Sequence, residues 1–249
     1  SIHLDFSSST GIFLILCLAS VMVFEFVNGF HDTANAVATV IYTRTLKPLT
    51  AVVWSGFMNF LGVLSSSYIF GMAVAMKIAG LLPLETVLSK NANDAIAMVL
   101  AAIVGAIIWN VGTWYFGIPC SSSHTMIGSL LGVGIVFSML PEYSSKAGVN
   151  WGEAYKIGNS LLISPLFGFS MAIVLMFILK RLVHNKQIFK EPEPDQRPPL
   201  WLRGILFLTC TLVSFFHGSN DGQKGVGLML IVLLAFMPVQ FALSPSFDK

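Results

Sequence analysis

Long apolar runs separated by short polar segments dominate the sequence. In chain order they cover residues 11–27, 34–42, 50–79, 95–116, 126–140, 157–182, 202–216 and 226–243. The longer runs reach the ~20 residues that a helix needs to cross a bilayer. Their apolar residues do not alternate with polar ones, as they would in the strands of a membrane barrel. Because helices satisfy their own backbone hydrogen bonds in lipid, the pattern predicts an all-α multi-pass membrane protein.

Composition agrees with a membrane location. Of the 249 residues, 55% are hydrophobic and 10% are charged, whereas about a quarter of a soluble domain is charged. The net charge is +2 and no dense basic run occurs, so no nucleic-acid partner is expected. The three cysteines lack metal-site or redox spacing. The chain also has no P-loop sequence, and we expect no organic cofactor.

Basic residues gather around two polar segments. Arg44 and Lys47 lie in the first, and residues 183–201 form the second, which is rich in proline and charge. The positive-inside rule predicts that both segments face the cytoplasm. That requires an even number of crossings between them, which a helical hairpin over residues 95–140 allows whether it dips in and returns or crosses twice. We therefore expect residues 183–201 to be a cytoplasmic linker without a packed core.

The sequence contains one internal echo. Residues 29–37 resemble residues 218–226, and each copy is a polar segment between two apolar half-spans. An odd number of predicted crossings separates the copies, so they should enter the membrane from opposite sides. Inverted repeats with broken helices are typical of secondary transporters, whose substrate sites lie at the interruptions. The serine-rich hairpin at 95–140 belongs to the first of the two units.

The expected organisation follows from this repeat. A first repeat unit covers residues 1–182, with its signature at 28–44, and the linker follows it. Residues 202–249 begin a second, inverted unit. Because the sequence ends soon after the second signature and before a second serine-rich hairpin, the second repeat is expected to be truncated.

Two acids in the signatures are candidate ion ligands. A carboxylate such as Asp32 or Asp221 inside an apolar span costs at least ~2.5–3.5 kcal/mol, so it usually faces a cavity and has a function. It could bind a cation, accept a proton, or cap a half-helix. Asn35, Asn220 and Gln223 add amides nearby, and such oxygen ligands suit a hard cation such as sodium.

A lysine and three histidines adjoin the same motifs. Lys224 lies in the second signature and could reach a membrane surface, pair with Asp221, or attract an anionic substrate. His31, His124 and His217 could relay protons or could serve in packing. The residue types alone leave these alternatives open.

The segment Pro-Cys-Ser-Ser-Ser-His-Thr at residues 119–125 is the other dense polar cluster. Proline should end the preceding helix, and the serines should cap a helix that begins near Thr125. The unpaired first-turn amides and the positive end of the helix dipole favour an anion such as phosphate. A plain helix cap in a turn is the alternative.

Together, residues 28–44, 119–125 and 217–225 resemble the inorganic phosphate transporter (PiT) family, in particular its bacterial low-affinity branch. The family signature G-A-N-D-x-A-N corresponds to residues 29–35, and its repeat to residues 218–224. The resemblance implies a cation-coupled phosphate symporter that works by alternating access in the bacterial inner (plasma) membrane. The oligomeric state, a homodimer included, is left open.

Carried over position by position, the resemblance implies two sets of site residues. The coupling-ion set comprises Asp32, Asn35, Asn220 and Asp221. The phosphate set comprises Asn35, Ser121, Ser122, Ser123, Thr125, Gln223 and Lys224. Gln223 and Lys224 depart from the Ala-Asn of the general signature in the way typical of the bacterial branch. That branch implies proton coupling and uptake of metal–phosphate complexes that contain a divalent cation, whereas sodium at Asp32 and Asp221 remains the alternative.

Two other functions fit parts of the pattern. Sulfate is also tetrahedral, so a sulfate permease of the same family would use the same serines. Ser-Ser-Ser-His also resembles the nucleophile region of membrane lipid phosphatases. Those enzymes need further Lys…Arg-Pro and Ser-Arg…His…Asp segments, which do not occur here in usable order. The sequence therefore predicts a transporter rather than an enzyme.

Overall fold

The computed structural model describes residues 9–66, 73–82, 84–88, 91–143, 149–184, 189 and 197–237. In these residues the regular structure is helical, and the helices are α1 (Ser9–Tyr42), α2 (Pro48–Ser65), α3 (Ala73–Ala79), α4 (Leu84–Leu88), α5 (Ala92–Tyr115), α6 (Ser122–Met139), α7 (Trp151–Leu182) and α8 (Leu200–Phe236). Six of them, α1, α2, α5, α6, α7 and α8, are long and apolar enough to cross a membrane. The prediction of an all-α multi-pass membrane protein is confirmed.

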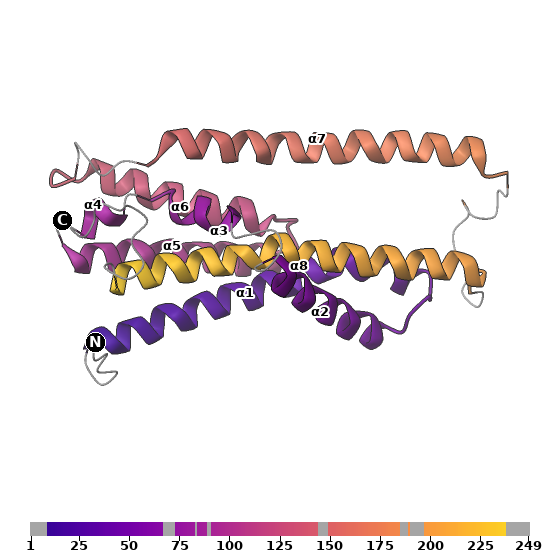
Figure 1. The fold of residues 1–249 in the computed structure, drawn as a ribbon, viewed down its shortest axis with the longest axis horizontal. Coiled ribbons are helices and arrows are strands. Elements are labelled where there is room, and N and C mark those ends of the chain that lie inside the picture. The colour runs from indigo at the N-terminus through magenta and orange to yellow at the C-terminus, as the bar shows by residue number, and fades with distance from the viewer. Residues whose placement is uncertain are drawn as a thin grey trace.

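Helix α8 runs through the middle of the molecule, and α1 runs in the opposite direction below it (Figure 1). They pack against each other, and each carries one signature near the middle of its length. The opposite orientation of the two copies agrees with the prediction of an inverted repeat. The boundaries of the repeat units at 1–182 and 202–249 stay a prediction.

Both signatures lie within unbroken helices, so the prediction of broken helices at these positions is wrong. Helix α1 continues through residues 28–37 and α8 continues through residues 217–226. Neither segment contains proline, and the glycines keep helical backbone. The drop in hydropathy at each signature comes from polar side chains on one helix face, which pair with one another instead of interrupting the helix.

The glycines of this region serve close helix packing. A Cβ atom at Gly62 of α2 would overlap the Phe215 carbonyl, and one at Gly218 of α8 would overlap the backbone of Asn59. In the same interface the buried hydroxyls of Ser55 and Ser214 lie 2.9 Å apart. Small residues let two membrane helices approach to this distance and form such hydrogen bonds.

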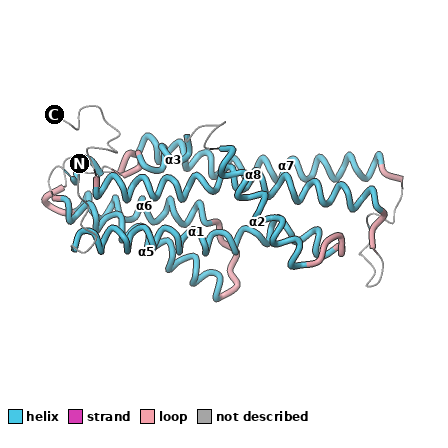
Figure 2. Tube along the Cα trace, turned by 60° about the horizontal axis from the view of Figure 1, so that its bottom comes forward, coloured by secondary structure: helices cyan, strands magenta, loops and turns pink. Residues whose placement is uncertain are grey.

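Helices α5 and α6 form the predicted hairpin. They lie antiparallel, and the connection between them is near the middle of the long axis, so the hairpin occupies one half of the molecule (Figure 1). Figure 2 shows the same half as a packed bundle with α1 and α3. Its core is apolar and includes Phe24, Met98, Leu130 and Ile231. The hairpin thus dips to the middle of the molecule and returns.

Helix α7 lies away from α8 over most of its length (Figure 1). None of the residues in its most apolar 18-residue window is buried. The predicted linker follows this helix, but of residues 183–201 the structure describes only 183–184, 189 and 197–201, and α8 already begins at Leu200. The rest of the linker prediction lies outside the described residues, as do residues 238–249 of the predicted second unit.

Candidate functional site

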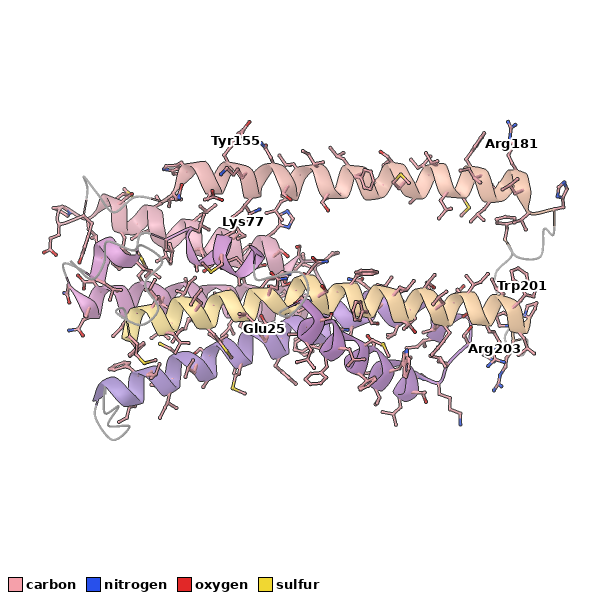
Figure 3. All side chains as sticks on the ribbon, viewed as in Figure 1. Glu25, Lys77, Tyr155, Arg181, Trp201 and Arg203 are labelled. Atoms are coloured by element: carbon pink, nitrogen blue, oxygen red, sulfur yellow. The ribbon has the colours of Figure 1, made fainter. Side chains whose placement is uncertain are left out.

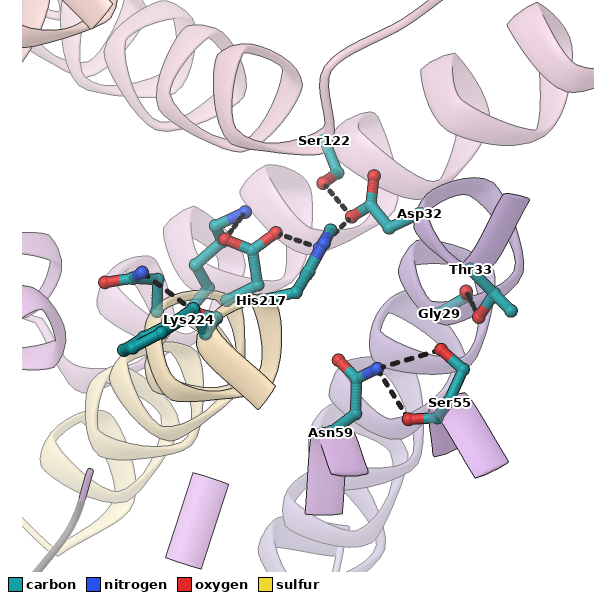
Figure 4. A network of polar contacts seen from close by, with 11 residues as sticks. Gly29, Asp32, Thr33, Ser55, Asn59, Ser122, His217 and Lys224 are labelled. Atoms are coloured by element: carbon teal, nitrogen blue, oxygen red, sulfur yellow. Dashed lines mark hydrogen bonds and ion pairs between the residues drawn. The ribbon is translucent and has the colours of Figure 1, made fainter. Parts of the chain in front are cut away.

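The two signatures meet at His217. Its Nε2 atom lies 2.7 Å from Oδ2 of Asp221, one turn further along α8, and 3.1 Å from Oδ2 of Asp32 on α1. The Nε2 atom therefore faces two carboxylates from two helices (Figure 4). This bridge brings Asp32 and Asp221 together, and their role as ion ligands stays a prediction.

Lys224 extends the cluster along α8. Its buried Nζ lies 2.8 Å from Oδ1 of Asp221. The spacing of His217, Asp221 and Lys224 is i, i+4 and i+7, so the three side chains share one helix face. Of the three alternatives for Lys224, burial of the side chain argues against a position at a membrane surface, and the contact shows that it pairs with Asp221 in this structure. A role toward an anionic substrate stays a prediction.

The start of α6 reaches the same cluster. Ser122 is buried, and its hydroxyl donates to Oδ2 of Asp32 over 3.4 Å. The helix begins at Ser122, with Ser121 as the N-cap residue but without a side-chain capping bond. The expected start near Thr125 is therefore wrong by three residues. Because the serines belong to the first turn, their backbone amides are among those that a helix leaves unpaired.

The three serines face three different spaces. Ser121 and Thr125 line a cavity of about 530 Å³ together with His124. Ser122 contacts Asp32, and Ser123 lines a cavity of about 210 Å³. Successive residues in a helix point about 100° apart, so consecutive serines cannot all face one ligand in this arrangement.

Ser123 nevertheless connects the serine segment to the basic side of the cluster. The 210 Å³ cavity that it lines is also lined by three lysines, Lys77, Lys156 and Lys224. Lys156 has its own partner, because its Nζ lies 2.7 Å from Oε1 of Glu153. An anion in this cavity would meet hydroxyl and ammonium groups together.

The acidic side of the cluster opens into a separate cavity of about 230 Å³ between α1, α2 and α8. Its lining includes Glu25, Asp32, Asn59, His217 and Asp221. The cavity brings together the carboxylates of both signatures. The predicted ion ligands Asp32 and Asp221 therefore line a common cavity.

The predicted amide ligands are placed less centrally. Asn35 is exposed on α1. Asn220 is also exposed, and its amide donates to the Phe216 carbonyl of its own helix over 2.9 Å. Gln223 is buried, and its amide donates to the Ser219 carbonyl over 3.3 Å. The structure brings together the charged residues and Ser122 from the predicted sets, but not these amides.

Glu25 and His217 are site residues that the sequence left unassigned. Glu25, Asn28 and Asp32 share one face of α1, because they are separated by three and then four residues. Glu25 also packs beside Gly225 of α8, where a Cβ atom would crowd the Glu25 carboxyl group. His217 lies four residues before Asp221. Helical spacing from each aspartate would have found both residues, provided that the helices were taken as unbroken.

A family model for the phosphate transporter family matches residues 28–244. The match covers most of the chain and includes all three motifs. The chain belongs to this family. No solved structure matches it.

Named relatives in this family are similar along nearly the whole chain. The low-affinity inorganic phosphate transporter PitB of Escherichia coli (strain K12) is 42% identical over 245 residues, which are 94% of this chain and 48% of PitB. The low-affinity inorganic phosphate transporter of Buchnera aphidicola subsp. Acyrthosiphon pisum is 39% identical over 95% of this chain and 49% of its own length. The chain spans about half the length of these relatives. These relatives are named as transporters, which gives no support to the alternative of a lipid phosphatase.

The central cluster has the geometry to hold a cation. Asp32, His217 and Asp221 each offer one ligand atom, and these atoms lie within 4.8 Å of one another. A site with an imidazole nitrogen suits a divalent transition metal, or a proton on the imidazole itself, better than sodium, which prefers oxygen ligands. Lys224 competes for Asp221, so a metal would have to displace its ammonium from Oδ1 or use Oδ2.

Proposed function

We propose that this chain takes part in cation-coupled symport of inorganic phosphate across the membrane by alternating access. One observation carries the proposal: the hydroxyl of Ser122, at the start of α6, contacts the same Asp32 carboxylate that His217 bridges to Asp221. A helix start, which favours an anion, is thereby joined to an acid cluster, which favours a cation.

The anion would bind at the first turn of α6. Backbone amides at a helix start and serine hydroxyls are donors that suit phosphate oxygens. Ser123 leads from this turn to the cavity shared with Lys224, so the buried ammonium is the cation of this chain best placed to balance the charge. Ser121 and Thr125 would contact phosphate from the neighbouring cavity only after α6 rotates or another part of the protein closes over it.

The coupling cation would be a proton held in the Asp32–His217–Asp221 cluster. With His217 neutral, the two carboxylates outweigh the one ammonium of Lys224, and the cluster repels an anion. Protonation of the cluster removes the excess negative charge beside the helix start, so proton and phosphate binding stabilise each other. This gives the linkage that symport requires. Sodium remains the second candidate, because a carboxylate pair can also bind it.

A metal–phosphate complex is an extension of the same idea. A divalent cation brought in as cargo could take ligands from Asp32, His217 and Asp221 while its phosphate contacts Ser122. We further propose that the protein lies in the bacterial inner membrane with residues 183–201 on the cytoplasmic side. A homodimer is compatible with this arrangement.

The proposal is tested by uptake of labelled phosphate into proteoliposomes that contain the purified chain, under an imposed proton or sodium gradient. We expect accumulation driven by the proton gradient, and Asp32→Asn should reduce it to background because the cluster loses one of its two charges. The matched control is Glu142→Gln, which removes an exposed acid in the connection after α6 and should leave uptake unchanged.

Four results would contradict the proposal or parts of it. Unchanged uptake by Asp32→Asn would remove the cluster from the mechanism. Equal uptake under sodium alone would replace the proton as coupling ion. Complete competition by sulfate at equal concentration would favour the sulfate permease, because phosphate would then not be the preferred anion. No accumulation under either gradient would contradict transport by this chain.

A further inference from the structure

A second cluster of charge lies at the end of the molecule where α1 ends and α8 begins. Among the residues that the structure describes, a cavity of about 680 Å³ there is lined by four cations, Arg44, Lys47, Arg197 and Arg203. None of these lining residues is acidic. Such a concentration of one sign of charge in a hollow attracts anions.

The cavity is assembled from segments far apart in the sequence. Arg203 lies in the first turn of α8, and its guanidinium donates to the Thr45 carbonyl in the α1–α2 turn over 3.4 Å. The turn itself is closed by a 3.0 Å bond from the Leu46 amide to the Val40 carbonyl, and Arg44 adopts a left-handed backbone conformation with φ of 54°. The positions of the cations are therefore set by a folded turn and a helix start.

One donor in this cavity has no partner. Nε of Arg203 is buried from solvent and makes no hydrogen bond within the described structure. Because the Nε–H of Arg203 has no hydrogen-bond partner, it can donate to an acceptor that enters the cavity. Phosphate oxygens are acceptors that match guanidinium geometry.

The surroundings of the cavity fit the surface of a membrane. Three apolar helices terminate here: α1 at Tyr42, α2 at Pro48 and α8 at Leu200. Tyr42, Leu49, Leu200 and Trp201 are exposed at this end. Figure 3 shows Trp201 and Arg203 together at the same tip. Exposed tyrosine and tryptophan are typical of the level of lipid headgroups.

We propose that this cavity binds the phosphate group of an anionic phospholipid from the adjoining leaflet. Basic hollows between membrane helices recognise anionic headgroups in this way. The apolar rim of this end of the molecule, made of the exposed side chains of Leu49, Leu200 and Trp201, would contact the acyl chains. Free inorganic phosphate offers the same charged group but makes no use of the rim. The site lies at the tip of the molecule, away from the Asp32–His217–Asp221 cluster, and does not depend on the proposed transport.

The test measures lipid bound to the purified chain in neutral detergent by native mass spectrometry. Phosphatidylglycerol is compared with phosphatidylcholine. We expect retention of phosphatidylglycerol and not of phosphatidylcholine. Lys47→Gln/Arg197→Gln should weaken binding of phosphatidylglycerol by roughly tenfold or more, from about fivefold for each cation removed. Arg203→Gln is a second variant that removes the buried donor.

The matched control is Lys180→Gln/Arg181→Gln. It removes two exposed cations at the same end of the molecule, on α7, which do not line the cavity. Binding of phosphatidylglycerol should stay within about twofold of the parent chain, because substitutions far from the cavity do not couple to it. Circular dichroism is used to check that each variant keeps its helix content.

Three outcomes would overturn the proposal. Equal losses in the two double variants would show general attraction of the charged end for lipid. Equal retention of the two lipids would show that headgroup charge is not recognised. Displacement of phosphatidylglycerol by millimolar inorganic phosphate would assign the cavity to the free anion instead of the lipid.

Discussion

The spacing of single residues along two helices builds the site. Glu25 and Asp32 lie on one face of α1, and His217, Asp221 and Lys224 lie on one face of α8. Each of these charges would be costly alone inside a membrane protein. Removing one partner of a buried pair typically costs about 3–5 kcal/mol, because the other charge is left uncompensated. Shape-conserving substitutions such as Asp32→Asn are therefore needed to separate function from folding.

Tyr143 provides a prediction of pH dependence outside the membrane helices. Its hydroxyl donates to Oδ2 of Asp94 over 2.7 Å, and this bond raises the pKa of Tyr143 from 10.0 to about 12. The pKa is higher in the folded state, so the contact stabilises the fold fully below pH 10 and its contribution is lost as pH rises to about 12.

Absorbance of tyrosinate checks this assignment. One of the five tyrosines should ionise near pH 12 in the parent chain, and that late component should be absent in Tyr143→Phe. Asp94→Asn should lower the pKa of Tyr143 toward 10.0. The variant removes the carboxylate that accepts the hydrogen bond and whose negative charge opposes ionisation of the tyrosine. A late component that persists in Tyr143→Phe would contradict the assignment.

At the scale of elements, α2 packs closely against the part of α8 that carries the second signature. The backbone of Asn59 occupies the space beside Gly218, and Val63 occupies the space beside Gly222. The hydroxyl pair of Ser55 and Ser214 and the 2.9 Å bond from Trp54 Nε1 to Thr211 Oγ1 hold the same interface. This packing aligns the face of α8 that carries His217 with α1.

Gly218→Ala should destabilise the protein, because its methyl group would force α8 away from Asn59. We expect a loss of about 1–3 kcal/mol in the free energy of unfolding, which is typical of overpacking. Gly204→Ala, on the same helix but beside open space, should be neutral or stabilising by about 0.5–1 kcal/mol. Reversible denaturation in detergent, followed by circular dichroism, compares the two variants, and equal stabilities would contradict this account of the interface.

At the scale of the whole molecule, the two ends of the long axis differ in charge, and different helix–helix connections lie at each end. The α1–α2 turn and the start of α8 share one end, and the connection from α6 to α7 lies at the other (Figure 1). The cations Arg44, Lys47, Arg197 and Arg203 belong to the first end. By the positive-inside rule this end should face the cytoplasm.

Labelling of single cysteines tests this orientation. In a chain whose Cys17, Cys120 and Cys210 are replaced by alanine, Lys47→Cys and Arg197→Cys should react with an impermeant maleimide in inside-out vesicles only. Glu142→Cys, in the connection after α6, should react in right-side-out vesicles only. Labelling of Lys47→Cys and Arg197→Cys from opposite sides would contradict the fold, and reversal of the whole pattern would contradict only the orientation.

The sequence by itself determined what depends on composition and local pattern. Long apolar runs in lipid must form helices, so the all-α class and most spans were predictable, and acids inside those runs marked Asp32 and Asp221. The basic residues around 44–47 and 183–201 indicated that these segments share one side, and the α1–α2 turn and the start of α8 do lie at one end (Figure 1).

Only the tertiary structure decided which side chains face each other. A single residue rotates a helical side chain by about 100°, so the start of α6 at Ser122 instead of near Thr125 directs the three serines to three different spaces. A hydropathy profile shows that a signature is polar, but it does not show which side chains pair with those polar residues. The continuity of α1 and α8 could therefore not be predicted from hydropathy. The central place of His217 likewise depends on the packing of α8 against α1, which no local pattern encodes.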